Sequence, residues 1–143
     1  MTENDSTPFI LLVEDNPGDV QLTQIAFQDA GFDVSIQVAM DGVEAIEFLE
    51  DEEAPCPDLI LLDLNLPRKN GFDVLEEIKS DSELRQLPVI VLTSSASSDD
   101  VILSYEQHAN AYLTKPTNPG SFVDLIQSTG EFWIEKARMP SYS

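Results

Sequence analysis

Apolar and polar positions along the chain alternate between short apolar runs and longer segments with helical spacing. Leu59–Leu62 and Pro88–Leu92 are continuous apolar runs, which are typical of strands buried on both faces of a sheet. Phe9–Val13 is a third apolar run, and a turn signal follows it. Loose alternation along Phe32–Ala39 is typical of a half-exposed strand, and Ala111–Thr114 is a short final strand. The apolar pattern therefore predicts five strands.

Five further segments have the apolar spacing or the end signals of helices. In the first, from Pro17 to Ala30, apolar residues recur three, four and eight positions after Leu22. Pro17 suits the first helical position, and Gly31 suits the cap after the last turn. The other predicted helices are one that Asp41-Gly42 opens and that ends near Glu50, and the segments Gly71–Ser80, Ser97–His108 and Ser121–Lys136.

Strands that alternate with helices in this way predict a parallel sheet with helices on both faces. Right-handed crossovers leave few possible topologies. With 143 residues and five strands, the chain suits an α/β, flavodoxin-like doubly wound fold with five helices, in which the strands stand in the order 2-1-3-4-5. We expect one domain over residues 9–137, a disordered segment at 1–8 and a tail at 138–143. We expect no output domain after Lys136, because too few residues follow it.

The charge balance is strongly acidic, since 27 Asp and Glu residues against 7 Lys and Arg residues give a formal net charge of −20. Proteins bind nucleic acid mainly through cationic contacts to phosphate, so this composition argues against a nucleic-acid partner. The acidic residues are spread along the chain, where their repulsion opposes a compact state unless salt screens it. We interpret the excess as adaptation to a high-salt cytoplasm, with an ordinary acidic mesophilic protein as the alternative.

The chain contains no apolar segment of the roughly 20 residues that a transmembrane helix needs. Its polar, acidic N-terminus lacks the pattern of a secretory signal. The single cysteine, Cys56, excludes an internal disulfide and a multi-cysteine metal site. We therefore expect a cytoplasmic protein that does not bind a membrane.

Polar side chains follow the predicted strands at their carboxyl ends, where parallel sheets bind ligands. Glu14-Asp15 follow the first strand and Asp63 follows the third. Thr93 and Lys115 follow the fourth and fifth strands. Three carboxylates in one pocket repel each other and favour a hard cation, and Mg²⁺ prefers oxygen ligands. The sequence therefore predicts an Mg²⁺ site made by Glu14, Asp15 and Asp63.

The same edge of the sheet has the groups that phosphoryl transfer needs. A carboxylate can act as a nucleophile and become an acyl phosphate, and Asp63 has the most central position for this role. Lys115 is placed to pair with a phosphoryl oxygen, and Thr93 is placed to donate a hydrogen bond to it. Phosphoryl transfer requires little beyond such positioning and charge neutralisation.

Four stretches together resemble the receiver domain of two-component response regulators, and the resemblance covers nearly the whole chain. They are Ile10–Asn16 (ILLVEDN), Leu59–Pro67 (LILLDLNLP), Val91–Ser94 (VLTS) and Tyr112–Pro116 (YLTKP). Each stretch alone is a weak signal, whereas the combination in this order is specific. The resemblance implies that a sensor histidine kinase transfers a phosphoryl group to the chain. It also implies that the chain is no enzyme beyond catalysing its own phosphorylation and dephosphorylation.

The resemblance further implies a role for each residue at the carboxyl edge. The implied roles are phosphoacceptor for Asp63, metal ligands for Glu14, Asp15 and Asp63, a metal-binding backbone carbonyl for Asn65, switch hydroxyl for Thr93, switch aromatic for Tyr112 and phosphate-binding lysine for Lys115. The Lys115–Pro116 peptide is expected to be cis, a state that nearly always requires proline.

Other stretches resemble the stand-alone receivers found with phytochrome-type sensor kinases. They are Asn16–Asp19, Leu64–Lys69, Ser104-Tyr105 with His108–Tyr112, and Phe132-Trp133. Many stand-alone receivers of bacteria and archaea share these stretches without a phytochrome partner. The stimulus, the kinase and the downstream target therefore stay open.

Several of these residues also have purely structural interpretations. Glu14 and Asp15 could be acids that the dipole of the first helix favours. Thr93 could cap the next helix, and Tyr112 could be an ordinary strand aromatic. Arg68-Lys69 is the only adjacent basic pair, which is either a solvated loop or a site for docking the kinase.

The leading functional hypothesis is a signalling module whose output is contact with another protein. A small aspartate-nucleophile phosphohydrolase is the enzyme alternative, but its general acid would be Asn65, which cannot give a proton. A scaffold that is never phosphorylated is a third hypothesis, and the intact acceptor residues argue against it. A phosphate sink needs the same site and stays open.

We expect phosphorylation to alter the face formed by the last two helices and the last strand. Movement of Thr93 toward the phosphoryl group leaves space into which Tyr112 turns. Phe132-Trp133 lie at the end of this face, where an exposed aromatic pair suits a homodimer. The alternative is that both rings complete the core.

Overall fold

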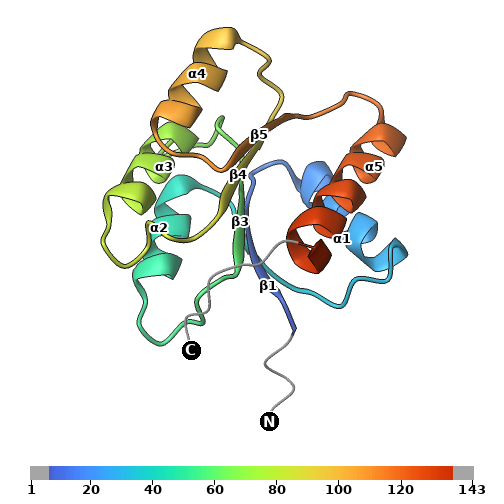
Figure 1. Cartoon of the computed structure of the whole chain (residues 1–143), viewed down its shortest axis with the longest axis horizontal. Helices are drawn as coiled ribbons and strands as arrows, with labels where there is room; N and C mark the ends of the chain where they lie inside the picture. The colour runs from blue at the N-terminus through green and yellow to red at the C-terminus, as the bar shows by residue number, and fades with distance from the viewer. Residues whose placement is uncertain (1–6, 137–143) are drawn as a thin grey trace.

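Figure 1 shows a central sheet with helices on either side, and the computed structural model describes residues 7–136. The strands are β1 (Phe9–Val13), β2 (Ser35–Ala39), β3 (Leu59–Leu62), β4 (Val89–Thr93) and β5 (Ala111–Thr114). The helices are α1 (Pro17–Asp29), α2 (Gly42–Glu50), α3 (Gly71–Ser80), α4 (Ser98–Glu106) and α5 (Pro119–Gly130), which a π-helical segment, η2 (Glu131–Lys136), continues. Within these residues no helix is long and apolar enough to cross a membrane. The expected disordered segment and tail lie outside them, apart from Thr7 and Pro8.

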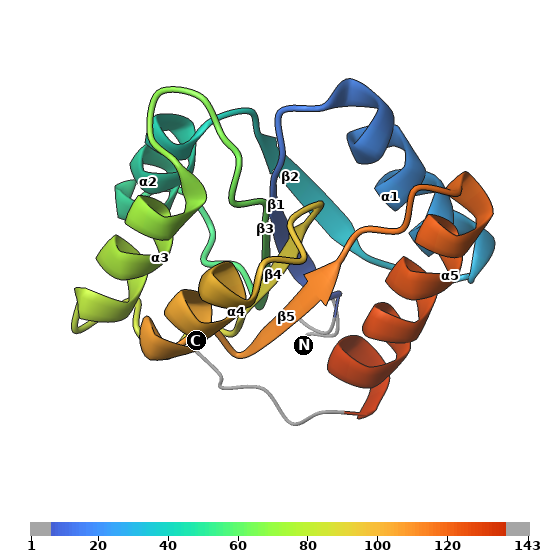
Figure 2. The ribbon, with the colours of Figure 1, turned by 90° about the horizontal axis from the view of Figure 1, so that it is seen from above.

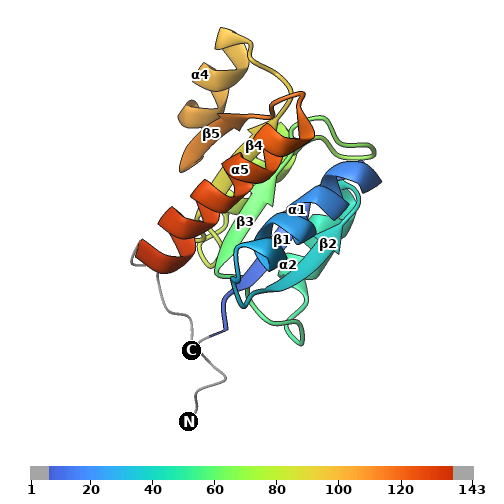
Figure 3. The same ribbon diagram turned by 90° about the vertical axis from the view of Figure 1, so that its right-hand side faces the viewer.

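The strands form one parallel sheet in the order β2-β1-β3-β4-β5, which confirms the predicted flavodoxin-like doubly wound fold. Seen from above, α1 and α5 cover one face of the sheet, and α2, α3 and α4 cover the other (Figure 2). α1 lies side by side with α5 on its face (Figure 3), and α2 packs against α3. Because all strands are parallel, their carboxyl ends lie at one edge of the sheet.

Successive residues of the strands enter two separate apolar layers. Leu11, Ile60 and Val91 belong to the layer that also contains the apolar residues of α2 and α3. Their chain neighbours Leu12 and Leu61 belong to the layer that contains those of α1 and α5. The continuous apolar runs in the sequence therefore reflect strands that are buried on both faces.

Two elements begin two or more residues from their predicted starts, for clear physical reasons. α5 begins at Pro119 rather than Ser121, because the Asn118 side chain caps the helix and proline suits its first turn. β2 begins later than predicted, because Phe32 turns into the layer under α1 and α5. There its ring meets Phe27 with 6.1 Å between the ring centroids.

Each helix that follows a strand begins with a polar side chain that accepts a hydrogen bond from the helix's own backbone. These caps are Asn16, Asp41, Asn70, Ser97 and Asn118. They satisfy amides that the first turn of a helix otherwise leaves free. The first turns of the helices are thereby held close to the carboxyl edge of the sheet.

Few cations balance the acidic surface. Among the described residues, the basic side chains in ion pairs are Arg68 with Asp41, Lys69 with Glu77, and Lys115, which lies inside a cluster of carboxylates. Most of the 27 acidic residues therefore contribute repulsion rather than attraction.

Salt should accordingly stabilise the fold well beyond the dilute range. Near molar salt the Debye length falls to about 3 Å, so repulsion among surface carboxylates is largely screened. We expect the Tm, measured by thermal melts, to be higher in multi-molar KCl than in dilute KCl. An equal or lower Tm at high KCl would identify an acidic protein whose stability does not depend on screening.

Candidate functional site

Three strand ends bring the residues that follow them to one place at the carboxyl edge. Backbone hydrogen bonds hold these residues as one-residue extensions of the sheet. The bonds are Glu14 N–H to Ala39 O (3.0 Å), Asp63 N–H to Val13 O (3.0 Å) and Lys115 N–H to Thr93 O (2.7 Å). The three side chains therefore start from fixed points at the ends of β1, β3 and β5.

The Lys115 ammonium lies among three carboxylates. Its Nζ is 2.7 Å from Glu14 Oε1, 2.8 Å from Asp19 Oδ2 and 3.2 Å from Asp63 Oδ2. The side chains of Lys115, Glu14 and Asp63 are 7%, 4% and 7% exposed. Because water is largely excluded, these charges interact more strongly than surface charges do. The structure thus brings together three residues that the sequence placed at separate strand ends.

Asp19 is the member of this cluster that the strand-end reasoning missed. It lies in the first turn of α1, where its N–H donates to the Asn16 cap at 3.1 Å. The available signal was its position three residues after the cap, in the first turn of a helix that starts at the carboxyl edge. An acid in a first turn is also favoured by the helix dipole. The pattern alone therefore does not distinguish an acid that only stabilises the helix from one that contacts Lys115.

Glu14, Asp15 and Asp63 have ligand atoms within 4.8 Å of one another. This oxygen-only set, with a net negative charge, fits a hard divalent cation. Next to it, the Asn65 N–H donates to Asp63 Oδ1 at 3.2 Å. Asn65 is therefore adjacent to the acidic cluster, while metal binding by its carbonyl stays a prediction.

Burial and neighbouring charges act in opposite directions on the pKa values of Glu14 and Lys115. Burial raises the pKa of Glu14 to about 7, although its hydrogen bond to Lys115 opposes the shift. Burial lowers the pKa of Lys115, but its hydrogen bonds to Asp19 and Glu14 outweigh this and raise the pKa above its ordinary value. Lys115 is therefore a cation at physiological pH.

The Thr93 hydroxyl is buried without a hydrogen-bond partner among the described residues. Thr93 is the last residue of β4 rather than the first residue after it, which is where the sequence placed it. It does not cap α4, because Ser97 accepts the hydrogen bond at that helix start. A buried hydroxyl without a partner is costly, so an acceptor next to Thr93 would remove this cost.

Tyr112 is half-buried on β5, and its ring packs against the apolar layer under α2 and α3. Its hydroxyl donates to the Ser95 carbonyl at 2.8 Å, and its N–H donates to the Tyr105 hydroxyl at 3.2 Å. The ring is therefore linked to the β4–α4 loop, which begins directly after Thr93.

The prediction that the peptide bond between Lys115 and Pro116 is cis is wrong. No peptide bond in residues 7–136 is cis. The trans form is intrinsically favoured even before proline, and Lys115 reaches its carboxylate partners with this backbone.

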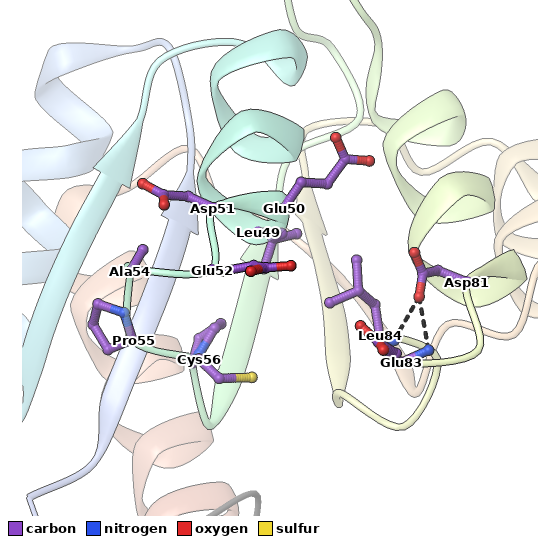
Figure 4. Close-up of a pocket in the computed structure, with 11 residues that line it drawn as sticks. Leu49, Glu50, Asp51, Glu52, Ala54, Pro55, Cys56, Asp81, Glu83 and Leu84 are labelled. Atoms are coloured by element: carbon purple, nitrogen blue, oxygen red, sulfur yellow. Dashed lines mark hydrogen bonds between the residues drawn. The ribbon is translucent and has the colours of Figure 1, made fainter.

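Residues of the α2–β3 and α3–β4 connections line a hollow of about 330 Å³ at the opposite edge of the sheet. Figure 4 shows the side chains that line it. Its wall contains the acids Glu50 and Glu52 together with Cys56. Partial burial and the nearby Asp58 carboxylate raise the pKa of the Cys56 thiol. The hollow lies away from the strand ends and shares no residue with the Lys115 cluster.

The two C-terminal aromatic rings have different environments. Phe132 and Trp133 meet edge to face with 5.4 Å between the ring centroids. Trp133 packs against the apolar layer under α1 and α5, whereas Phe132 is 55% exposed. One ring therefore completes the core, and the other is accessible.

A doubly wound sheet with an acidic cluster and a lysine at its carboxyl edge is the arrangement of a receiver domain. The chain belongs to the response regulator receiver domain family, which matches residues 10–127. This confirms the resemblance found in the sequence and places the protein in two-component signalling.

Among individual proteins, Response regulator Rcp1 of Synechocystis sp. is 43% identical, over 97% of each chain. The regulatory protein FilR2 of Methanothrix harundinacea is 41% identical, over 93% of this chain and 88% of that protein. The solved structure of the phosphorylated cyanobacterial phytochrome response regulator RcpA matches with a TM-score of 0.91 at 42% identity, over 94% of this chain and 99% of that one. The Mn²⁺-bound form of Rcp1 matches with a TM-score of 0.89 at 44% identity, with the same coverage.

The charges of the cluster predict opposite effects on Mg²⁺ binding for two substitutions. Asp15→Asn removes a ligand charge and should weaken binding. Lys115→Met removes a competing cation and should strengthen binding at a pH well above 7, where Glu14 is ionised. Coulomb energies at such separations are of the order of 1–4 kcal/mol, so each shift should exceed about fivefold. Calorimetric titration at fixed ionic strength measures both.

Lys69→Met is the matched control, because it removes a lysine that pairs with Glu77 on α3 instead. We expect its Mg²⁺ affinity to stay near that of the wild type. Shifts of the same sign in Asp15→Asn and Lys115→Met would contradict an electrostatic site shared by lysine and metal.

Proposed function

We propose that the chain accepts a phosphoryl group on Asp63 from a sensor histidine kinase, with Mg²⁺ bound by Glu14, Asp15 and Asp63. The observation that carries this proposal is the position of the Asp63 carboxylate. It lies 3.2 Å from the Lys115 ammonium and within 4.8 Å of ligand atoms of both other acids. Membership of the receiver family and the unpartnered Thr93 hydroxyl support it.

In the transfer, a carboxylate oxygen of Asp63 attacks the phosphorus of a phosphohistidine. The new P–O bond forms as the P–N bond breaks, and the histidine nitrogen leaves with the electron pair. Mg²⁺, when bound, supplies charge neutralisation for the phosphoryl oxygens. Lys115 already touches the acceptor and can exchange a carboxylate contact for a phosphoryl oxygen. Hydrolysis of the acyl phosphate returns the carboxylate, so the chain modifies only itself.

The response to phosphorylation begins at Thr93. A phosphoryl oxygen offers its unsatisfied hydroxyl the acceptor that it lacks, and Thr93 moves toward it. This movement opens space beside β5. Tyr112 then releases the Ser95 carbonyl and turns inward, so the β4–α4 loop and α4 adopt a second arrangement.

The output surface that we propose consists of α4, β5 and the end of α5. α4 already exposes apolar side chains, because Ile102, Leu103 and Tyr105 are 56%, 38% and 49% exposed. Phe132, in the η2 segment that continues α5, is a further exposed apolar residue. Such residues suit a protein partner, and we propose a second copy of the chain as that partner.

The input that we propose is a phytochrome-type sensor kinase in the cytoplasm. RcpA is a phytochrome response regulator, and its similarity to this chain supports this assignment. An enzyme of the phosphohydrolase class is disfavoured. Asn65, which stands where such an enzyme needs its general acid, cannot supply a proton.

Phosphorylation should require Mg²⁺ and be lost in Asp63→Asn, because this substitution removes the nucleophile. We expect incubation with acetyl phosphate, followed by mapping of the acyl phosphate, to label the wild type at Asp63. Asp29→Asn is the control, since Asp29 is an exposed acid at the end of α1. Wild-type labelling of Asp63→Asn would exclude Asp63 as the acceptor.

The apolar surface predicts that the phosphoryl analogue beryllofluoride increases the dimer fraction, measured by light scattering at high salt. Phe132→Ala should reduce dimerisation and leave the Tm nearly unchanged, because Phe132 is largely exposed. Trp133→Ala should instead lower the Tm, since Trp133 packs on the core. A monomer under every condition would reject the homodimer.

A further inference from the structure

The loop after the acceptor strand, residues 64–70, is tied to an element beside the site. Arg68, within this loop, has a left-handed backbone with φ 64°. Its Nη1 lies 3.0 Å from Asp41 Oδ2. A non-glycine residue rarely adopts this backbone, and it persists where surrounding contacts hold it. The ion pair with Asp41 is a contact of this kind.

Asp41 uses its two carboxylate oxygens for different purposes. Oδ1 accepts the Glu44 N–H at 2.8 Å and so caps α2, while Oδ2 binds Arg68. The Asp41 side chain is only 10% exposed, which places this end of the pair inside the protein. Arg68, whose own side chain is 58% exposed, is thus paired with the residue that caps α2.

Two glycines show that the loop backbone lies directly on its neighbours. A Cβ at Gly42 would overlap the Lys69 carbonyl oxygen, so the loop rests on the first turn of α2. A Cβ at Gly71 would overlap the Asp63 carbonyl oxygen, where the loop joins α3. The Gly71 N–H also donates to Leu64 O at 2.9 Å. The loop is therefore held at both ends.

The order of the strands shows where the Arg68–Asp41 pair lies relative to the acidic residues of the site. Asp41 follows β2, Arg68 follows β3, and β1 lies between these two strands. The ion pair therefore joins segments that follow the two neighbours of β1, and the carboxyl end of β1 leads into Glu14 and Asp15. Asn65, whose carbonyl is the proposed fourth metal ligand, belongs to the same loop.

We propose that Arg68 is a positioning residue for phosphoryl acceptance. Its ion pair with Asp41 holds loop 64–70 against the start of α2 and so holds the Asn65 backbone beside the metal-binding carboxylates. This inference rests on the proposed function. It differs from the interpretation of Arg68-Lys69 as a docking site for the kinase, because it requires Arg68 even when no kinase is present.

Amide hydrogen exchange in the Mg²⁺-free protein tests the tether without any phosphorylation. Arg68→Gly removes the ion pair and suits the left-handed backbone, so the fold should be retained. We expect exchange of the Lys69 and Gly71 amides to be severalfold faster in Arg68→Gly, with the central strands unchanged. Asp41→Ser, which keeps a capping oxygen on α2, should have the same effect.

The metal dependence of self-phosphorylation tests the consequence for the site. With acetyl phosphate as donor, Arg68→Gly and Asp41→Ser should each need about tenfold more Mg²⁺ for half-maximal labelling, as is typical when support of a metal ligand is lost. The double variant should be no worse than either single variant, because both break one interaction. Arg68→Lys, which keeps a cation, should restore part of the Mg²⁺ dependence.

Arg85→Ala is the matched control, because it removes an exposed arginine from the α3–β4 connection at the opposite edge of the sheet. Its exchange rates and Mg²⁺ dependence should equal those of the wild type.

Unchanged loop exchange in Arg68→Gly would overturn the tether. A defect in Arg68→Gly with the kinase alone, and none with acetyl phosphate, would assign Arg68 to docking instead. Failure of the wild type to label would reject the proposed function, while the exchange data would still decide the tether.

Discussion

One buried cation among carboxylates is the interaction on which the rest of this structure depends. Glu14 and Asp63 follow β1 and β3, and Asp19 lies in α1; all three contact the Lys115 ammonium that follows β5. Removing one partner from a buried ion pair typically costs about 3–5 kcal/mol, because the other charge is left uncompensated. In a chain of net charge −20, this lysine makes a concentrated acidic cluster possible at the strand ends. Lys115 offsets only part of this negative charge, so the cluster remains net negative, as a site for a hard divalent cation requires.

The fold could be predicted from the sequence because its signals are local and agree with one another. Apolar runs such as Leu59–Leu62 identified the central strands, and they are buried on both faces in the structure. The remaining errors came from competition between local signals and packing. Phe32 continues an alternating strand pattern in the sequence, yet in the structure it leaves the strand to pack against Phe27. The start of α5 differs for a local reason, because the Asn118 cap and Pro119 act together two residues before the predicted start at Ser121.

The site was only partly predictable because its contacts join residues far apart in the chain. Residues that directly follow strands, such as Asp63 and Lys115, could be located from the parallel topology alone. Asp19 could not, since its contact with Lys115 depends on how α1 leaves the sheet. The left-handed backbone of Arg68 also cannot be recognised from the composition of the chain or the spacing of its residues. The unpartnered state of the Thr93 hydroxyl appears only when every neighbour is in place.

A crystal structure with Mg²⁺ and beryllofluoride tests the central claim most directly, because it shows where an incoming phosphoryl group meets the buried charges. We predict beryllium bound to an Asp63 carboxylate oxygen, with the Thr93 hydroxyl and the Lys115 ammonium within about 3 Å of its fluorines. The Tyr112 hydroxyl should then no longer bind the Ser95 carbonyl. An analogue bound elsewhere, or bound at Asp63 with the Thr93 hydroxyl still unpartnered, would contradict the role assigned to this cluster.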